Sequence, residues 1–98
     1  MTPVADRIRA KLAQALVPSR LAVRDESHRH AGHAGARPEG ETHFHVEIAA
    51  AVFAGKSRIA RQRLIYQVLA EELAGPVHAL SLIALTPEED QDSQQHQR

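Results

Sequence analysis

The feature that most constrains the fold is a strand pattern, a helix pattern and a second strand pattern that follow one another in the second half of the chain. Side chains alternate between apolar and polar over residues 42–48, which predicts a strand with one buried face. Ser57 is a suitable N-cap for a long helix, and Gly75-Pro76 ends that helix. Residues 77–85 predict another strand. Because a helix joins these two strands, the connection is long enough for them to be parallel.

The N-terminal part of the chain predicts an amphipathic helix and a short strand. Thr2 and Pro3 suit the cap and the first position of this helix, and Pro18 ends it. Apolar side chains recur along it at helical spacing: Val4, Ile8, Leu12 and Leu16. Residues 20–24 alternate and predict a strand that pairs antiparallel with the next one. The order is therefore αββαβ, an α/β (α+β) fold with a three-stranded mixed sheet and helices packed on one face.

Three segments fall outside these elements. Residues 49–54 are apolar without alternation and predict a bend with a short helical turn at Val52 and Phe53. Residues 28–40 have no periodicity and are expected to form a long flexible loop. Residues 88–98 are polar and glutamine-rich, and we expect a disordered tail. A chain of 98 residues supports a single domain, here residues 1–87, with one modest core.

Composition excludes several classes of protein. The formal net charge is zero, which argues against a general affinity for nucleic acid. No apolar run approaches the length of a membrane span, and residues 1–9 lack the apolar segment of a secretory signal, so we expect a cytoplasmic protein. The chain has no cysteine, hence no disulfide and no thiolate. Its seven histidines are the side chains best suited to bind a metal.

Motifs for catalysis are weak. Gly55-Lys56-Ser57 is similar to the end of a phosphate-binding loop, but Ala50 occupies the position where that motif needs a glycine. The serines lack a nucleophile-elbow motif, and the sequence alone shows no pairing of a base with an orienting group. We therefore expect a protein that is not an enzyme.

The histidines allow several interpretations. His43 and His45 project from the same face of a strand and could chelate a metal, or they could be solvated residues of an outward face. His78 opens an otherwise apolar strand, where a structural histidine is the usual explanation. The histidines of the loop could bind zinc or nickel adventitiously: His28, His30 and His33.

Basic residues gather at the start of the long helix, and acidic residues lie at its end. This arrangement opposes the helix dipole by a few tenths of a kcal/mol per charge, which suggests that the basic end has a role. The role could be phosphate binding, protein docking, or simply a solvated face. The basic residues are Lys56, Arg58, Arg61 and Arg63, and the acidic ones are Glu71 and Glu72.

Six short motifs follow one another along most of the chain. They are Asp-Glu-Ser at 25–27, Thr-His-Phe at 42–44, Phe-x-Gly at 53–55, Arg-x-Arg at 61–63, Leu-Ala-Glu-Glu-Leu at 69–73 and Val-His-Ala-Leu at 77–80. As a set they resemble the BolA-like proteins. The resemblance implies an αββαβ fold related to the class II KH domain, in agreement with the pattern of elements.

The resemblance also implies a function. BolA-like proteins pair with monothiol glutaredoxins and share a [2Fe–2S] cluster, to which the glutaredoxin and a bound glutathione supply thiolates and the BolA-like partner supplies histidine. The implied ligands here are His78 and the loop residue His30, with His33 as an alternative. A chain without cysteine suits this division, because such clusters rely chiefly on thiolate ligands. The expected protein is a monomer when isolated, forms a heterodimer with the glutaredoxin, and acts in iron–sulfur cluster sensing, assembly or delivery.

A second role is associated with the same family. Residues 55–66 resemble a helix-turn-helix-like segment of a DNA-binding transcriptional regulator, in which Lys56, Arg58, Arg61 and Arg63 would contact phosphates. The chain departs from the family pattern at Gln62, where the family usually has histidine, and at His45, where it commonly has arginine or lysine.

Overall fold

The computed structural model describes residues 3–26 and 43–96, with side chains to residue 93. Its elements follow the chain in the order α1 (Val4–Leu16), β1 (Arg20–Asp25), β2 (His43–Ala49), η2 (Ala51–Phe53), α2 (Arg58–Val68), α3 (Ala70–Ala74), β3 (Ala79–Leu85) and α4 (Pro87–His96). The predicted loop 28–40 lies outside the described residues, as do residues 97–98 of the predicted tail. Helix α1 begins at Val4, one residue later than expected, because Pro3 takes the cap position.

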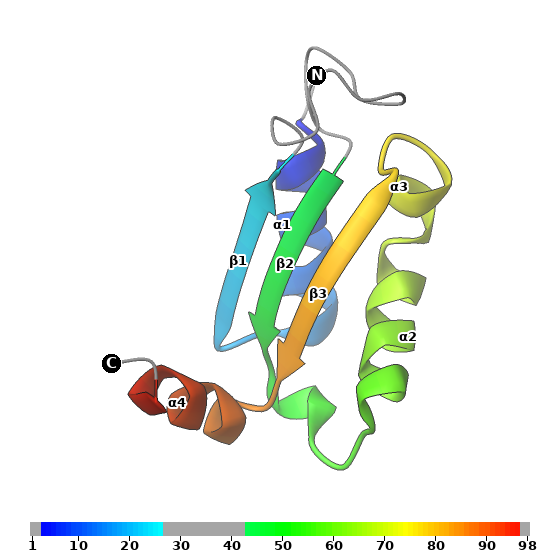
Figure 1. Cartoon of the computed structure of the whole chain (residues 1–98). Helices are drawn as coiled ribbons and strands as arrows, with labels where there is room; N and C mark the ends of the chain where they lie inside the picture. The colour runs from blue at the N-terminus through cyan, green and yellow to red at the C-terminus, as the bar shows by residue number, and fades with distance from the viewer. Residues whose placement is uncertain (1–2, 27–42, 97–98) are drawn as a thin grey trace.

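The sheet has the order β1-β2-β3, with β1 and β2 antiparallel and β2 and β3 parallel. Val46 of the central strand lies opposite Val23 on one side and Leu82 on the other. Figure 1 shows α1 behind the sheet and α2 alongside β3, while α4 lies at the end where β3 finishes. The mixed sheet and the αββαβ core order predicted from the sequence are confirmed.

The core lies between the sheet and α1, and it follows the sequence alternation. Phe44, Val46 and Ile48 of β2 are at most 2% exposed, whereas the intervening side chains are half-buried on the other face. The four apolar positions predicted for α1 are all buried. Burying one large aliphatic or aromatic side chain stabilises a fold by about 1.5–3 kcal/mol relative to exposure, so these faces hold the sheet and α1 together.

The connection between β2 and α2 follows the sequence prediction. Val52 and Phe53 lie in the short helical turn η2, with Phe53 fully buried. Gly55 adopts φ of 77°, a left-handed conformation that glycine takes without strain. The Ser57 hydroxyl then accepts a hydrogen bond from the Ala60 N–H at 3.1 Å, so it caps α2 as expected.

The long helix differs from the prediction in two respects. Leu69 leaves helical geometry (φ −102°, ψ 21°) and divides the helix into α2 and α3, although the Leu69 N–H still donates to the Ile65 carbonyl. Helical spacing also predicts an apolar stripe along this helix, made of Ile59, Ile65, Leu69 and Leu73, but Ile59 is 59% exposed. The apolar stripe therefore enters the core only in the later turns, where Ile65 and Leu69 are buried.

The expected disorder of residues 88–98 is wrong for the described part, because residues 87–96 form helix α4. The Glu89 N–H donates to the Thr86 hydroxyl at 3.2 Å, and the Thr86 N–H donates to the Glu89 carboxylate at 2.9 Å. This reciprocal pair is a capping box, and Pro87 suits the first helical position. Arg20 of β1 also holds Asp90 through bonds of 2.8 and 3.0 Å, which ties α4 to the sheet.

No helix in the described part of the chain is long and apolar enough to cross a membrane.

Candidate functional site

Two histidines meet where β2 and β3 begin, and we call this part of the molecule the histidine end. His43 is the first residue of β2 and pairs with Ala79, so His78 lies beside it at the start of the parallel neighbour. The two imidazole ring centres are 6.4 Å apart, with 34° between the ring planes. His78 is exposed and His43 half-buried. The sequence prediction missed this pair because it depends on the register of strands that a helix separates.

Helix α3 fixes the backbone beside His78. The N–H groups of Gly75 and Val77 both donate to the Glu72 carbonyl, at 3.3 and 3.0 Å, and the Val77 side chain is buried. These contacts hold the turn that leads into β3. The His78 imidazole makes no hydrogen bond to any residue that the structure describes, so a firmly held backbone presents an exposed ring.

Glu72 also links the turn at residues 75–77 to α1. Its carboxylate is fully buried and accepts hydrogen bonds from Arg7 at 2.9 Å and Lys11 at 3.0 Å. Burial alone would raise the pKa of Glu72, but hydrogen bonds from Lys11, from a backbone N–H and from Arg7, together with the Lys11 charge, outweigh it and hold the pKa below its usual value. Glu72 therefore remains ionised and links α1 to α3 beneath the histidine end.

Of the predicted cluster ligands, only His78 lies within the described residues. His78 lies at the histidine end as described, whereas His30 and His33 lie outside the described residues. Among the residues that are described, no group of three or more His, Cys, Asp or Glu side chains could hold a metal ion.

His45, the other histidine of β2, is engaged elsewhere. Its Nδ1 lies 2.7 Å from the Ser81 hydroxyl and its Nε2 lies 3.0 Å from the Glu47 carboxylate. The hydrogen bond from His45 lowers the pKa of Glu47, and Arg20 adds to the effect. Because both ring nitrogens already have partners, the structure does not bring His43 and His45 together as a chelating pair.

Ser81, His45 and Glu47 are arranged in the order of a nucleophile, a base and a carboxylate. The sequence alone could not show this arrangement. The three side chains lie on the face of the sheet opposite the core. Ser81, His45 and Glu47 do not line the pocket described below. A catalytic serine also needs donors that stabilise the developing oxyanion, so these three side chains alone do not define a catalytic site.

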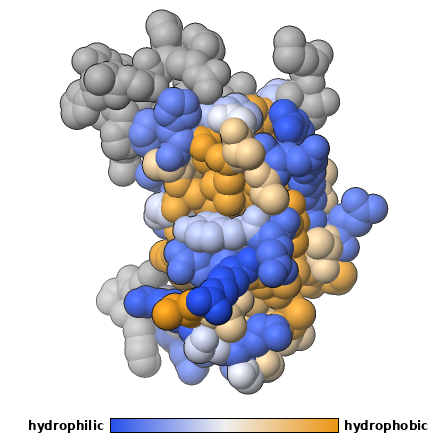
Figure 2. Space-filling view, turned by 90° about the vertical axis from the view of Figure 1, so that its right-hand side faces the viewer, coloured by the Kyte–Doolittle hydropathy of each residue, from blue (hydrophilic) through white to orange (hydrophobic). Residues whose placement is uncertain are grey.

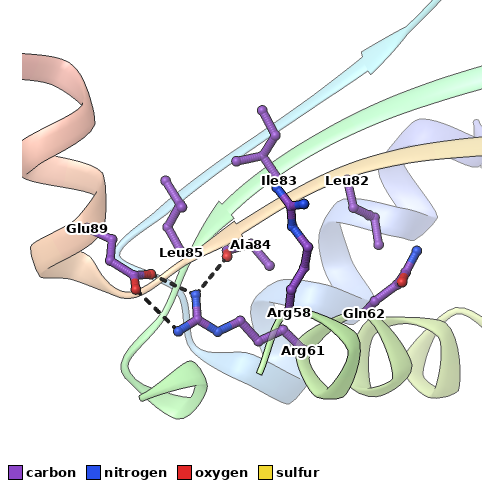
Figure 3. Close-up of a pocket in the computed structure, with 8 residues that line it drawn as sticks. All are labelled: Arg58, Arg61, Gln62, Leu82, Ile83, Ala84, Leu85 and Glu89. Carbon is purple, nitrogen blue, oxygen red and sulfur yellow. Dashed lines mark hydrogen bonds and ion pairs between the residues drawn. The ribbon is translucent and has the colours of Figure 1, made fainter. Parts of the chain in front are cut away.

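The opposite end of the sheet carries the basic residues, and we call it the basic end. A pocket of about 320 Å³ lies there between α2, the last residues of β3 and α4. Figure 3 shows Arg58 and Arg61 reaching from α2 toward β3. Arg61 donates to the Ala84 carbonyl at 3.0 Å and to the Glu89 carboxylate at 2.7 Å. The hydrogen bond from Arg61 lowers the pKa of Glu89, together with that from the backbone N–H of Thr86.

The remaining basic side chains are less engaged. Within the described residues, Lys56, Arg58 and Arg63 have no carboxylate partner. Gln62, which replaces the family histidine, donates to the Tyr66 hydroxyl at 2.9 Å. Figure 2 views this side of the molecule and shows hydrophobic side chains at the surface between hydrophilic ones. The surface is therefore mixed rather than uniformly basic.

The geometry described so far defines a small α+β domain with a KH-like order of elements, an open histidine end and a basic end. Residues 12–89 match the family model described as BolA-like protein. The chain therefore belongs to the BolA-like protein family.

Relatives of known name support this assignment. A BolA-like protein 1 from Mus musculus is 52% identical over 85 residues, which cover 87% of this chain and 59% of the relative. A SufE-like protein 1 from Arabidopsis thaliana, described as chloroplastic/mitochondrial, is 49% identical over 87 residues, covering 85% of this chain and 24% of the relative. This chain thus matches only part of the length of either protein.

Solved structures share the fold. The BolA domain of SufE1 from Arabidopsis thaliana superposes with a TM-score of 0.80 at 46% identity, covering 91% of this chain and 98% of that domain. The solution structure of BolA1 from Mus musculus also gives 0.80, at 41% identity, covering 99% of this chain and 76% of that one.

Proposed function

We propose that this chain is a binding partner rather than an enzyme, and that it donates His78 to a [2Fe–2S] cluster shared with a monothiol glutaredoxin and its bound glutathione. The observation that carries the proposal is the exposed imidazole of His78 on a turn fixed by Glu72 and Val77. A ligand to a cluster brought by another protein needs this combination, because the ring must be reachable and its backbone must not move away.

The donor set of the chain fits a shared cluster. The chain has no cysteine, and clusters of this type depend mainly on thiolates, so the thiolates come from the partner. An imidazole ligand in place of a thiolate raises the reduction potential of such a centre, as in histidine-ligated Rieske centres. The chain's own contribution is to bind, to orient His78 and to supply a second histidine, His30 or alternatively His33.

The family relationship is consistent with an iron–sulfur role. One relative joins a BolA domain to a SufE-like protein. The name of that relative places it in the chloroplast or mitochondrion.

The test is a titration of this protein into a cluster-bearing, glutathione-loaded monothiol glutaredoxin, followed by visible circular dichroism. We expect a spectral change that saturates at one copy of each protein and is lost in His78→Ala. His45→Ala is the matched control, because His45 lies on the neighbouring strand but is bound to Ser81 and Glu47. Absence of any change with the unsubstituted protein would contradict the proposal.

DNA binding by the basic end is the second candidate, and one observation favours it: Lys56, Arg58 and Arg63 have no carboxylate partner in the described residues. Each phosphate contact by such a side chain contributes to a salt-dependent affinity. The test is binding to duplex DNA over a range of salt concentrations. We expect Arg58→Ala and Arg63→Ala to flatten the salt dependence if this role holds, whereas His78→Ala should leave it unchanged.

A further inference from the structure

The pocket of the basic end lies at the free edge of the sheet. Strand β3 is the last in the order β1-β2-β3, so within the described residues no strand pairs with its other side. The pocket is lined by Leu82, which packs against the core, and by Ile83, which is 42% exposed on the opposite face. Because adjacent side chains of a strand point to opposite faces, a pocket that touches both lies along the strand edge itself.

The backbone of this edge offers hydrogen-bonding groups. The Leu85 carbonyl accepts from the Ala50 N–H at 3.0 Å and therefore faces β2. The Ala84 carbonyl accepts from Arg61 of α2 and therefore faces outward. Since the direction alternates along a strand, the N–H of Ala84 and both backbone groups of Leu82 also face outward, and no other described residue is bonded to them. Such a row of free N–H and C=O groups is a template for another extended chain.

The charge of the pocket indicates what that chain should carry. Figure 3 shows Arg58 extending from α2 toward Ile83, and Arg58 has no carboxylate partner in the described residues. The other guanidinium of the pocket, that of Arg61, is already bound to Glu89. Figure 2, which views this edge, shows hydrophobic side chains at the surface with hydrophilic ones around them. A ligand with one carboxylate among apolar side chains therefore complements the pocket.

We propose that the edge of β3 binds an extended, acidic and apolar segment of another protein as an added strand. Main-chain hydrogen bonds to Leu82 and to the Ala84 N–H supply affinity, while Arg58 pairs with the acidic side chain and Ile83 contacts an apolar one. The added strand stops at Ala84, because Arg61 occupies the Ala84 carbonyl. A strand rises about 3.3 Å per residue, so the pocket accommodates roughly three residues of the segment.

This site is separate from the proposed cluster ligand, and it does not rest on the proposed function. His78 precedes the first residue of β3, whereas the pocket lies along its later residues. Duplex DNA is the competing occupant, since its phosphates could also bind Arg58. The apolar side chains of Leu82 and Ile83 and the outward backbone groups favour a peptide, because DNA phosphates do not supply the alternating donors and acceptors of a strand.

The first experiment measures binding of a fluorescein-labelled, amidated peptide, Ser-Thr-Val-Asp-Val-Thr-Ser, by fluorescence anisotropy. We expect Arg58→Ala to weaken binding about fivefold, since an exposed ion pair contributes about that much, and a peptide with Asn in place of Asp to lose the same factor. Arg63→Ala is the matched control: it removes an equal charge from the same helix, but Arg63 does not line the pocket. Its affinity should equal that of the unsubstituted protein.

Ala84→Pro tests the main-chain hydrogen bonds. It removes an N–H that faces away from β2, a position where an edge strand tolerates proline, so pairing with β2 is retained while peptide binding should be lost. Amide NMR spectra establish that each variant is folded. In the unsubstituted protein, the peptide should slow hydrogen exchange of the Leu82 and Ala84 N–H groups but leave that of Ile83, whose N–H faces β2, nearly unchanged.

Three outcomes would overturn the proposal: no binding of the peptide, equal losses in Arg58→Ala and Arg63→Ala, or exchange that slows without this alternation. Duplex DNA that binds through Arg58 while the peptide does not would assign the pocket to DNA instead. The circular dichroism titration with the cluster-bearing glutaredoxin should be the same for Arg58→Ala and the unsubstituted protein. Failure of that titration with the unsubstituted protein would refute the shared cluster and leave the strand site standing.

Discussion

The two ends of the sheet present their charged and imidazole side chains in opposite ways. At the basic end, Arg61 is bound to Glu89 and to the Ala84 carbonyl, and Arg20 is bound to Asp90. At the histidine end, the ion pairs lie beneath the surface at Glu72, while His78 is exposed. The basic end therefore ties Arg20 and Arg61 to its own helix α4, whereas the histidine end leaves the His78 imidazole exposed.

The largest expected effect concerns the buried carboxylate beneath the histidine end. Glu72→Gln keeps the volume of the side chain but removes the charge that Arg7 and Lys11 bind. Losing charge-assisted hydrogen bonds at a buried group reduces the free energy of unfolding by about 1–3 kcal/mol. Chemical denaturation measures this loss.

Glu71→Gln is the control, since Glu71 binds the same Lys11 but its side chain is 81% exposed. An exposed ion pair contributes at most about 1 kcal/mol. Equal losses in the two variants would show that burial of Glu72 is not what secures the histidine end.

Acid should destabilise both ends of the sheet, and the histidine end more than the basic end. The pKa values of Glu72 and Glu89 are both lowered in the folded protein. Each carboxylate therefore contributes stability that is fully present above its usual pKa of 4.5 and is lost as the pH falls through its folded value. Because Glu72 is buried and the Glu89 side chain is 48% exposed, Glu72→Gln should reduce the acid sensitivity of unfolding more than Glu89→Gln. The measurement is the free energy of unfolding from pH 7 to pH 3, and the reverse order would contradict it.

At the basic end, the cap of α4 should matter locally. Thr86→Val retains the shape of the side chain but removes the hydroxyl that accepts the Glu89 N–H. Loss of an N-cap destabilises a helix by about 1 kcal/mol. Hydrogen exchange should become faster in α4 and remain unchanged around His78. Faster exchange at both ends would show that they are not independent.

The smallest effect tests whether α4 restrains Arg61. Glu89→Gln removes the carboxylate that Arg61 binds, whereas Glu88→Gln removes an equal charge from an exposed position of the same helix. If Arg61 can contact DNA phosphate once it is released, Glu89→Gln should steepen the salt dependence of duplex binding by about one ion. Fluorescence anisotropy measures that slope. The same slope in both variants would mean that only net charge matters.

Much of the fold could be predicted from the sequence because its signals are local. The alternation of β2, the helical spacing in α1 and the Ser57 cap each depend on neighbouring residues alone. The same kind of signal was present for α4, since Thr86, Pro87 and Glu89 have the spacing of a capping box. The polar, glutamine-rich composition of this segment favours disorder, but the capping box is present and the helix forms.

The site was less predictable because its contacts join distant parts of the chain. The exposure of Ile59 and the bond between Arg61 and Glu89 depend on where α2 and α4 lie. The partners of His45 and the proximity of His43 to His78 depend on the register between β2 and β3. No local pattern encodes that register. The family motif therefore points to His78 as a candidate ligand, but nothing in the sequence shows that His43 is its neighbour.

The parallel pairing of β2 with β3 has a consequence for how the protein folds. The contact between His45 and Ser81 joins residues 36 positions apart, and the pair at the histidine end has a similar separation along the chain. Closing such a span is entropically unfavourable and slows folding in proteins of this topology. The two imidazoles therefore meet only once the crossover through α2 and α3 is complete, so they are absent as a pair from partly folded chains. A ligand that contacts both strands there would bind the native state alone and raise the melting temperature with its concentration.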